Sequence, residues 1–498
     1  MAIELRTFVP PKEFFPPVGR IIQLFDKISR IPRASGAEEG IRNYVLEYAR
    51  HSALESHVDN VGNILVVVPA TKGCEEKPGV ILQTHMDMVT LPKDSPNDPA
   101  VVGVIPQVDT TGEWIFSEGT SLGADNGVGT AAAMTLAVDD SFQHGPIALL
   151  MTTDEEVGFT GANGLSFDYD FSNFKYLLNL DSERFGELCI GCAGGNFTEV
   201  VLPYDTELVR DRKILELNVS GLLGGHSGLD IDKGRNNAIK LLGNSLRMLL
   251  DENIDLRIIS LKGGEKKNSI PNYATAMIAL NDDQIVRAKN ILRTLESFGR
   301  GRATVEEKKL KISLDDVDGL VSEVMMTEDS TQKTIYLINN LPNGVLKRFS
   351  DSDIIISSTN VGTLDLQGNR VNIGLLTRSS TEEDREKANS YIEGSVSASV
   401  IVSHELPFSG WEPNFDQEII ALLQEQYKDL TGKEIRLDVT HAGVECGAIL
   451  QNPKFSHLQA VSFGPTIEGA HSVNERANIA SIEKFYSLLK RVVEKIAA

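Results

Sequence analysis

The stretch VILQTHMD, residues 80–87, joins an apolar run of strand length to a histidine and an aspartate. Similar apolar runs lie at 63–68, 147–151 and 176–180, and the Ala-rich segment 127–138 between them has high helix propensity. Strands that alternate with helices are typical of an α/β fold with parallel strand pairs. The sequence therefore predicts an α/β sheet with parallel parts in the first half of the chain.

The pattern of the sequence changes near residue 205 and changes back near residue 402. Between these points, strand-like and helical segments recur in two loosely similar units, while residues 300–350 fit no clear period. After 403 the chain returns to the α/β pattern. We therefore expect one discontinuous domain, residues 1–205 and 403–498, and an inserted domain, residues 206–402.

Composition excludes several classes of protein. The net charge of −22 disfavours nucleic acid and anionic membrane surfaces as partners. No apolar stretch approaches the roughly 20 residues that span a bilayer, and the N-terminus lacks a signal-peptide pattern. Four cysteines in 498 residues form no disulfide framework. We expect a reduced, cytoplasmic protein.

Acidic residues and a histidine follow three of the predicted strands. They are His85 and Asp87 after the first, Glu155 and Glu156 after the second, and Asp181 after the third. Ligands of open α/β sheets bind beyond the carboxyl ends of the strands, so these side chains should meet at one edge. Asp125 in GADNG and His471 in GAHSVNE stand in glycine-containing loops from which they can join the cluster.

Each of these residues alone has a structural explanation. Asp125 is placed to cap a helix, Glu155 and Glu156 can be a solvated pair, and His85 can be a hydrogen-bonded structural residue. Together they are the set that a site for two metal ions requires, and imidazole with carboxylate suits zinc, cobalt or manganese. Asp87 can then hold the free ring nitrogen of His85. Two adjacent glutamates allow one to bind metal while the other acts as a general base.

Six ordered motifs extend this interpretation: THMDM, GADNG, TTDEEVG, NLDSE, GGHSG and GAHSVNE. In this order the chain resembles the zinc-dependent aminoacylase, carboxypeptidase and dipeptidase superfamily, and in detail its aminoacyl-histidine dipeptidase branch. Stretches such as IPRASGAEE, LKGGEKKNSIP and HAGVECG carry the resemblance over nearly the whole chain. It implies a two-domain α/β metallopeptidase. The catalytic domain would have a mixed sheet with helices on both faces, and the inserted α/β domain would serve as lid and dimer contact.

The resemblance also implies roles for the clustered residues. Two Zn²⁺ ions, with Co²⁺ or Mn²⁺ as substitutes, would be held by His85, Asp125, Glu156, Asp181 and His471. Asp125 would bridge the ions and Asp87 would orient His85. Glu155 would be the general base for a metal-activated water that hydrolyses dipeptides with free termini, Xaa-His dipeptides included. The implied assembly is a homodimer.

Further residues resemble substrate contacts of that branch. His226 in GGHSG would approach the oxyanion, and Asn268 and Arg378 would contact substrate from the lid, since arginine suits bidentate capture of a carboxylate. Glu445 in HAGVECG could receive the free α-amino group, with His441 beside it. The alternatives are a turn histidine, a turn asparagine, a surface arginine and a structural His441.

Two rival functions remain open. One is another activity within the superfamily: a tripeptidase, a carboxypeptidase or an amidohydrolase of N-acyl amino acids. Glu445 favours substrates with a free amino end over acylated ones. The other is a metal-binding scaffold without turnover, against which the intact Glu155 argues, since a structural metal site needs no spare base.

Overall fold

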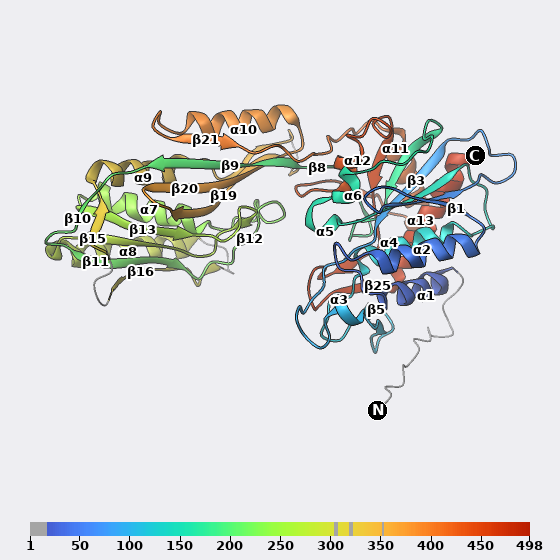
Figure 1. Cartoon of the computed structure of the whole chain (residues 1–498), viewed down its shortest axis with the longest axis horizontal. Coiled ribbons are helices and arrows are strands. Elements are labelled where there is room, and N and C mark those ends of the chain that lie inside the picture. The colour runs from blue at the N-terminus through green and yellow to red at the C-terminus, as the bar shows by residue number, and fades with distance from the viewer. Residues whose placement is uncertain (1–16, 303–306, 318–321, 351–352) are drawn as a thin grey trace. The chain divides into compact units, whose positions relative to one another are not determined.

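The computed structural model describes residues 17–302, 307–317, 322–350 and 353–498. The chain divides into two compact units (Figure 1). Unit 1 runs to Gly191 and also contains Pro413–Asp438 and Val444–Ala498, and unit 2 contains Cys192–Glu412 and Val439–Gly443. The predicted boundaries near 205 and 402 both lie inside unit 2. Strand β9 (Gly194–Pro203) ends just before the first point and β21 (Ile401–His404) contains the second, and the two strands pair with each other in the sheet of unit 2.

Unit 1 is built on a mixed eight-stranded sheet in the order β1-β2-β6-β3-β7-β23-β8-β22. In that order the strands are Glu55–Val58, Ile64–Val68, Ile147–Thr152, Gly79–His85, Phe174–Asn179, Gln459–Ser462, Glu187–Cys192 and Arg436–Thr440. The pairs β3–β6, β3–β7 and β7–β23 are parallel, whereas β1–β2 and β2–β6 are antiparallel. The predicted α/β fold is confirmed.

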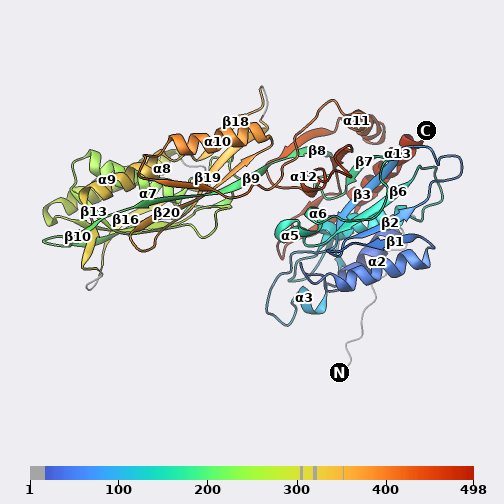
Figure 2. The ribbon, with the colours of Figure 1, turned by 45° about the horizontal axis from the view of Figure 1, so that its top comes forward.

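The parallel strands of unit 1 bring their carboxyl ends to one edge of the sheet. β3 lies between β6 and β7 (Figure 2). His85, the last residue of β3, is opposite Thr152, the last residue of β6, and Gln83 is opposite Asn179, the last residue of β7. The polar residues that follow each strand therefore start from neighbouring positions.

Helices and a small second sheet complete unit 1. The helices are α1 (Val18–Ser29), α2 (Glu39–His51), α3 (Pro99–Val102), α4 (Ala124–Leu136), α5 (Glu155–Gly158), α6 (Thr160–Asn163), α11 (Glu418–Thr431), α12 (Glu445–Ile449) and α13 (Ile479–Ala497). The small sheet has the order β24-β25-β5-β4, with bounds Ile467–Glu468, Arg476–Asn478, Trp114–Phe116 and Gln107–Val108. Helix α4 is buried on nearly every side, which its alanines and glycines permit, and it packs against α1 and β3.

Unit 2 contains a nine-stranded sheet in the order β16-β11-β15-β13-β19-β20-β9-β21, with β18 paired to β19. The strands not yet given are Lys311–Asp316, Lys213–Ser220, Ala274–Leu280, Leu256–Gly263, Ile355–Leu366, Arg370–Ser379 and, for β18, Gly344–Arg348. Two short pairs lie outside it: β10 (Thr206–Leu208) with β17 (Val324–Met326), and β12 (Gly225–His226) with β14 (Ser269–Ile270). All of these pairings are antiparallel.

The helices of unit 2 are α7 (Ala238–Asp251), the 3-10 turn Asp282–Gln284, α8 (Ile285–Arg302), α9 (Glu328–Asn340) and α10 (Glu382–Gly394). Helix α7 buries Ile239, Leu242, Leu246 and Leu249 on one face, and each such side chain contributes about 1.5–3 kcal/mol on burial. Helix α9 lies in the stretch that fitted no pattern in the sequence. Among the described residues, no helix is long and apolar enough to cross a membrane.

Candidate active site

Two groups of metal-ligating side chains share the carboxylate of Asp125. Its Oδ1 lies 3.0 Å from Nε2 of His85, and that nitrogen is 3.2 Å from Oδ1 of Asp181. Its Oδ2 lies 3.1 Å from Nε2 of His471, and that nitrogen is 2.9 Å from Oε2 of Glu156. The structure thus brings together all the residues predicted as ligands, with one oxygen of Asp125 facing each group.

Local backbone structure sets these positions. The carboxylate of Asp125 faces His85 and His471 and accepts no backbone N–H of helix α4 within the described residues, so Asp125 does not serve as the helix cap that was its structural alternative. His471 lies between β24 and β25 with φ of 59°, a left-handed conformation that is uncommon for a residue with a Cβ. Such backbone strain at a polar residue is typical of functional sites.

Asp87 is fully buried and contacts both sides of the site. Its Oδ1 lies 3.4 Å from Nδ1 of His85, within ion-pair distance, and its orienting role stays a prediction. It also accepts the backbone N–H groups of Glu155 at 3.0 Å and Glu156 at 3.2 Å, and the hydroxyl of Ser35 at 2.8 Å. Although burial opposes ionisation, His85 and these donors lower the pKa of Asp87 to about 2. Its carboxylate therefore fixes the turn that carries both glutamates, a role that the sequence did not reveal.

Glu155 stands in a third group with His85 and Glu156 whose ligand atoms are close together. Burial raises the pKa of Glu155 well above its usual range, and the charges of Asp181 and Glu445 raise it further. A buried carboxyl group whose pKa is raised is a stronger base and is suited to accept and return a proton.

The groups of metal-ligating side chains contain more carboxylates than imidazoles, so their negative charge exceeds their positive charge. Burial raises the pKa of Asp181, and raises that of Glu183 to about 7. Hydrogen bonds to Asp125 and Glu156 raise the pKa of His471 to about 11. Oε1 of Glu156 is buried with no hydrogen-bond partner in the described part of the chain. Dense carboxylates with two imidazoles and a free buried oxygen fit bound divalent cations, which relieve the mutual repulsion.

Glu445 is buried and makes its hydrogen bonds within the protein. It is 0% exposed, and its Oε2 accepts hydrogen bonds from Gln83 at 2.5 Å and from Thr152 at 2.7 Å. Burial raises its pKa to about 8. These contacts join β3, β6 and α12, so the observed role of Glu445 is to link elements. Its contact with a substrate amino group stays a prediction.

Four predicted substrate residues lie in unit 2. Arg378 is 5% exposed, and its guanidinium lies 3.4 Å from Nε2 of His226 and 3.4 Å from Oγ of Ser227. No carboxylate comes within ion-pair distance of Arg378 among the residues that the structure describes. Nε2 of His441 lies 2.7 Å from Oγ of Ser358. The surface-arginine alternative for Arg378 is therefore wrong, because the side chain is buried.

The pKa values of the two histidines near Arg378, His226 and His441, lie well below 7. Burial and the charge of Arg378 lower the pKa of His226 to about 4 and that of His441 to about 3. Asn268 lies next to His226, because its carbonyl accepts the N–H of Ser227 at 3.0 Å and β14 pairs with β12. A buried guanidinium beside neutral imidazoles makes a local site for an anion.

Comparisons with known proteins agree with this geometry. The model of peptidase family M20/M25/M40 matches residues 81–495. A cytosol non-specific dipeptidase of Escherichia coli (strain K12) is 35% identical over 480 residues, which cover 95% of this chain and 97% of that protein. The chain belongs to peptidase family M20/M25/M40. It is a peptide hydrolase, as the motifs predicted.

Solved structures of M20 type share the fold. The aminoacylhistidine dipeptidase of Vibrio alginolyticus superposes with a TM-score of 0.83 at 31% identity, covering 96% of each chain. Human carnosine dipeptidase 1 has a TM-score of 0.51 at 13% identity and covers 96% of each chain, which shows a common fold only.

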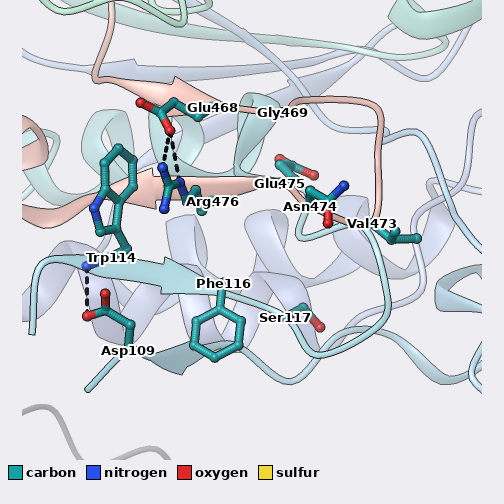
Figure 3. Close-up of a pocket in the computed structure, with 10 residues that line it drawn as sticks. All are labelled: Asp109, Trp114, Phe116, Ser117, Glu468, Gly469, Val473, Asn474, Glu475 and Arg476. Atoms are coloured by element: carbon teal, nitrogen blue, oxygen red, sulfur yellow. Dashed lines mark hydrogen bonds and ion pairs between the residues drawn. The ribbon is translucent and has the colours of Figure 1, made fainter. Parts of the chain in front are cut away.

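In this M20 peptidase the loop that carries His471 also borders a pocket of about 580 Å³. Trp114 and Phe116 on β5 form its apolar wall, and Arg476 pairs with Glu468 while lying 4.2 Å over the ring of Trp114 (Figure 3). None of the predicted ligands lines this pocket. Of its polar side chains, Arg476 and Glu468 pair with each other, whereas Glu475 binds the backbone of residues 122–125.

Sequence reasoning missed several residues that support the M20 site. Arg33, Ser35 and Glu38 lie in IPRASGAEE, and their side chains contact the backbone or side chain of the ligand loops. The signal was a cluster of polar residues in a short loop between two helices, but polar loops are usually exposed. Only the tertiary structure shows that Arg33 is 1% exposed and Glu38 4% exposed.

Proposed function

We propose that this chain is a two-metal dipeptidase that hydrolyses dipeptides with free termini, Xaa-His dipeptides included. The observation that carries the proposal is the shared carboxylate of Asp125, whose two oxygens face separate groups of ligands. The names of two similar proteins support the substrate class: a non-specific dipeptidase and an aminoacylhistidine dipeptidase.

One cation would be held by His85, Asp125 and Asp181, and the other by Asp125, Glu156 and His471. Imidazole with carboxylate suits Zn²⁺, and Co²⁺ or Mn²⁺ can substitute. When bound, such ions polarise the scissile carbonyl and make a water molecule acidic enough to attack at neutral pH.

Glu155 moves the protons in the proposed reaction. Its carboxylate accepts the proton of the attacking water and returns it to the nitrogen of the leaving amine. Asp87 assists by holding the backbone N–H of Glu155 at 3.0 Å, which fixes the turn on which the base stands. Burial raises the pKa of Glu155, which makes its carboxylate a stronger base.

We assign the residues around Arg378 in unit 2 to binding the polar groups of the substrate. The guanidinium of Arg378, which lacks a carboxylate partner among the described residues, would bind the C-terminal carboxylate in bidentate fashion. Neutral His226 can donate one N–H to the developing oxyanion, a contribution of about 3 kcal/mol. Asn268 and His441 border these two residues.

Assembly and location complete the proposal. We expect a homodimer, which sedimentation equilibrium would test. The E. coli relative is named a cytosol enzyme, which supports a cytoplasmic location.

The test is hydrolysis of a substrate panel: Ala-His, β-Ala-His, Ala-Ala, Gly-Gly-Gly and N-acetyl-methionine. Each is assayed with Zn²⁺, Co²⁺ or Mn²⁺ and with a chelator as control. Chelator-sensitive cleavage of the dipeptides supports the proposal. Cleavage of N-acetyl-methionine instead would identify an aminoacylase, cleavage of Gly-Gly-Gly alone a tripeptidase, and no turnover a metal-binding scaffold.

A further inference from the structure

The loop that presents Asp125 is held by a carboxylate from a distant part of the chain. Glu475, which is 3% exposed, stands directly before β25 (Figure 3). Its Oε2 accepts the N–H groups of Leu122 at 2.8 Å and Gly123 at 2.9 Å. Its Oε1 accepts those of Ala124 at 2.7 Å and Asp125 at 3.3 Å. One side chain thus binds four successive amides at the N-terminus of α4, where a negative charge is favoured.

A buried arginine holds the same loop through its carbonyls. Arg33 is 1% exposed, and its Nη2 donates to the carbonyl of Gly123. Its Nη1 donates to the carbonyls of Met86 at 3.0 Å and Asp87 at 2.7 Å. Arg33 therefore ties the segment that follows His85 to the segment that precedes Asp125.

The fit around Arg33 is tight. Gly123 has φ of +69°, and a Cβ at this residue would lie 2.5 Å from Nη2 of Arg33. Glycine is therefore required here for its backbone conformation and for the close approach of the guanidinium. The loop has no room to shift toward Arg33.

Glu475 also connects the two groups of ligands. It lies in the loop of His471, and its own N–H donates to the carbonyl of Ser472 at 3.2 Å. The same residue thus contacts the segment that carries Asp125 and belongs to the segment that carries His471. Glu475 therefore links the segments that carry these two ligands.

We propose that Arg33 and Glu475 are positioning residues that set the spacing between the two proposed cations by fixing residues 122–125 from both sides. Neither residue belongs to the groups of ligands around Asp125, so both act through that residue. Burying a charge costs free energy, and neither charge has an ion-pair partner within the described ranges. Their hydrogen bonds go instead to backbone groups, which fixes the position of the backbone. The inference rests on the proposed two-metal function.

The test compares Glu475→Gln with Glu468→Gln in metal-free full-length protein titrated with Zn²⁺ by calorimetry. A glutamine at 475 offers one acceptor oxygen and turns its NH₂ group toward backbone N–H groups. We expect at least one of the two Zn²⁺ equivalents to bind 10- to 100-fold more weakly. The Co²⁺-loaded variant should also show an altered visible absorption spectrum. Glu468→Gln removes an exposed carboxylate from the same hairpin and should match the wild type.

Arg33→Lys is the second variant, in case Glu475→Gln does not fold. Lysine keeps the charge but cannot bond three carbonyls in the arginine geometry, so Zn²⁺ affinity should fall while the metal-free protein stays folded. A lower melting temperature with unchanged Zn²⁺ affinity and Co²⁺ spectrum in both variants would overturn the inference, because a purely structural role predicts that result. If the wild type itself binds no Zn²⁺, the proposed function fails and the inference fails with it.

Discussion

Glu155 and Glu156 are neighbours in the chain, yet their carboxylates have different surroundings. Oε2 of Glu156 lies 2.9 Å from His471, within the group that shares Asp125. Glu155 instead combines burial with repulsion from nearby carboxylates, which raises its pKa. This difference supports the proposal that Glu156 binds a cation while Glu155 carries the proton.

We expect Glu155→Gln to retain both cations and to lose about 10³-fold in kcat, because the amide cannot accept a proton. Metal content measured by atomic emission and turnover of Ala-His check this. Glu156→Gln is the matched comparison and should lose metal affinity. Substantial turnover by Glu155→Gln would remove Glu155 from the role of base.

At the scale of elements, Asp139 joins α13 to the chain just beyond α4. It accepts hydrogen bonds from Lys490 at 3.0 Å and from the hydroxyl of Tyr486 at 2.9 Å. Although burial opposes ionisation, hydrogen bonds from Ser141, Lys490 and Tyr486 lower the pKa of Asp139 to about 2. A carboxylate with a lowered pKa stabilises the fold above its unfolded pKa of about 3.9, and this contribution is lost as the pH falls toward 2.

Asp139→Asn should therefore lower the free energy of unfolding by about 1 kcal/mol at pH 7, after allowance for solvent screening. The difference from the wild type should shrink as the pH is lowered from 4 toward 2. Urea denaturation at a series of pH values measures it. Asp140→Asn changes the same charge at an exposed neighbour and should have little effect. A pH-independent difference would contradict the assigned cause.

The elements around the site were predictable because each has a strong local pattern. The predicted run 147–151 is β6 (Ile147–Thr152), and the Ala-rich segment 127–138 overlaps α4 (Ala124–Leu136). Helix α9 was not predicted, since its sequence EDSTQKTIYLINN mixes polar and apolar residues with weak amphipathic character. Its start depends on Thr327, whose hydroxyl caps the N–H of Ser330.

The candidate ligands could be predicted, whereas the residues that hold them in place could not. His85 and Asp181 follow strands, so a rule for strand ends applies to them. Arg33 and Glu475 act on backbone groups 53 or more residues away in sequence, and no local pattern encodes such contacts. The order of strands in the sheet could not be predicted for the same reason. Strand β23, from the C-terminal part of the chain, lies between β7 and β8.

At the scale of the whole molecule, bound cations should contribute to stability. Each site stabilises the fold by about 2.7 kcal/mol when the free cation is at 100 times its Kd, and the carboxylates repel one another without it. We expect a chelator to lower the melting temperature by several degrees and Zn²⁺ to restore it, as measured by scanning calorimetry. His471→Ala should show a smaller shift. An identical melting temperature with and without chelator would contradict cation binding.

The place of β23 in the sheet has a consequence for synthesis on the ribosome. Unit 2 is almost contiguous, from Cys192 to Glu412, so most of it can fold as soon as that segment has emerged. Unit 1 cannot, because β23 (Gln459–Ser462) fills a central position between strands made much earlier. Until then the edge of β7 next to that position stays unpaired, and an unpaired edge invites association with other chains. The period before β23 has been synthesised is therefore the one in which this protein most needs protection from aggregation.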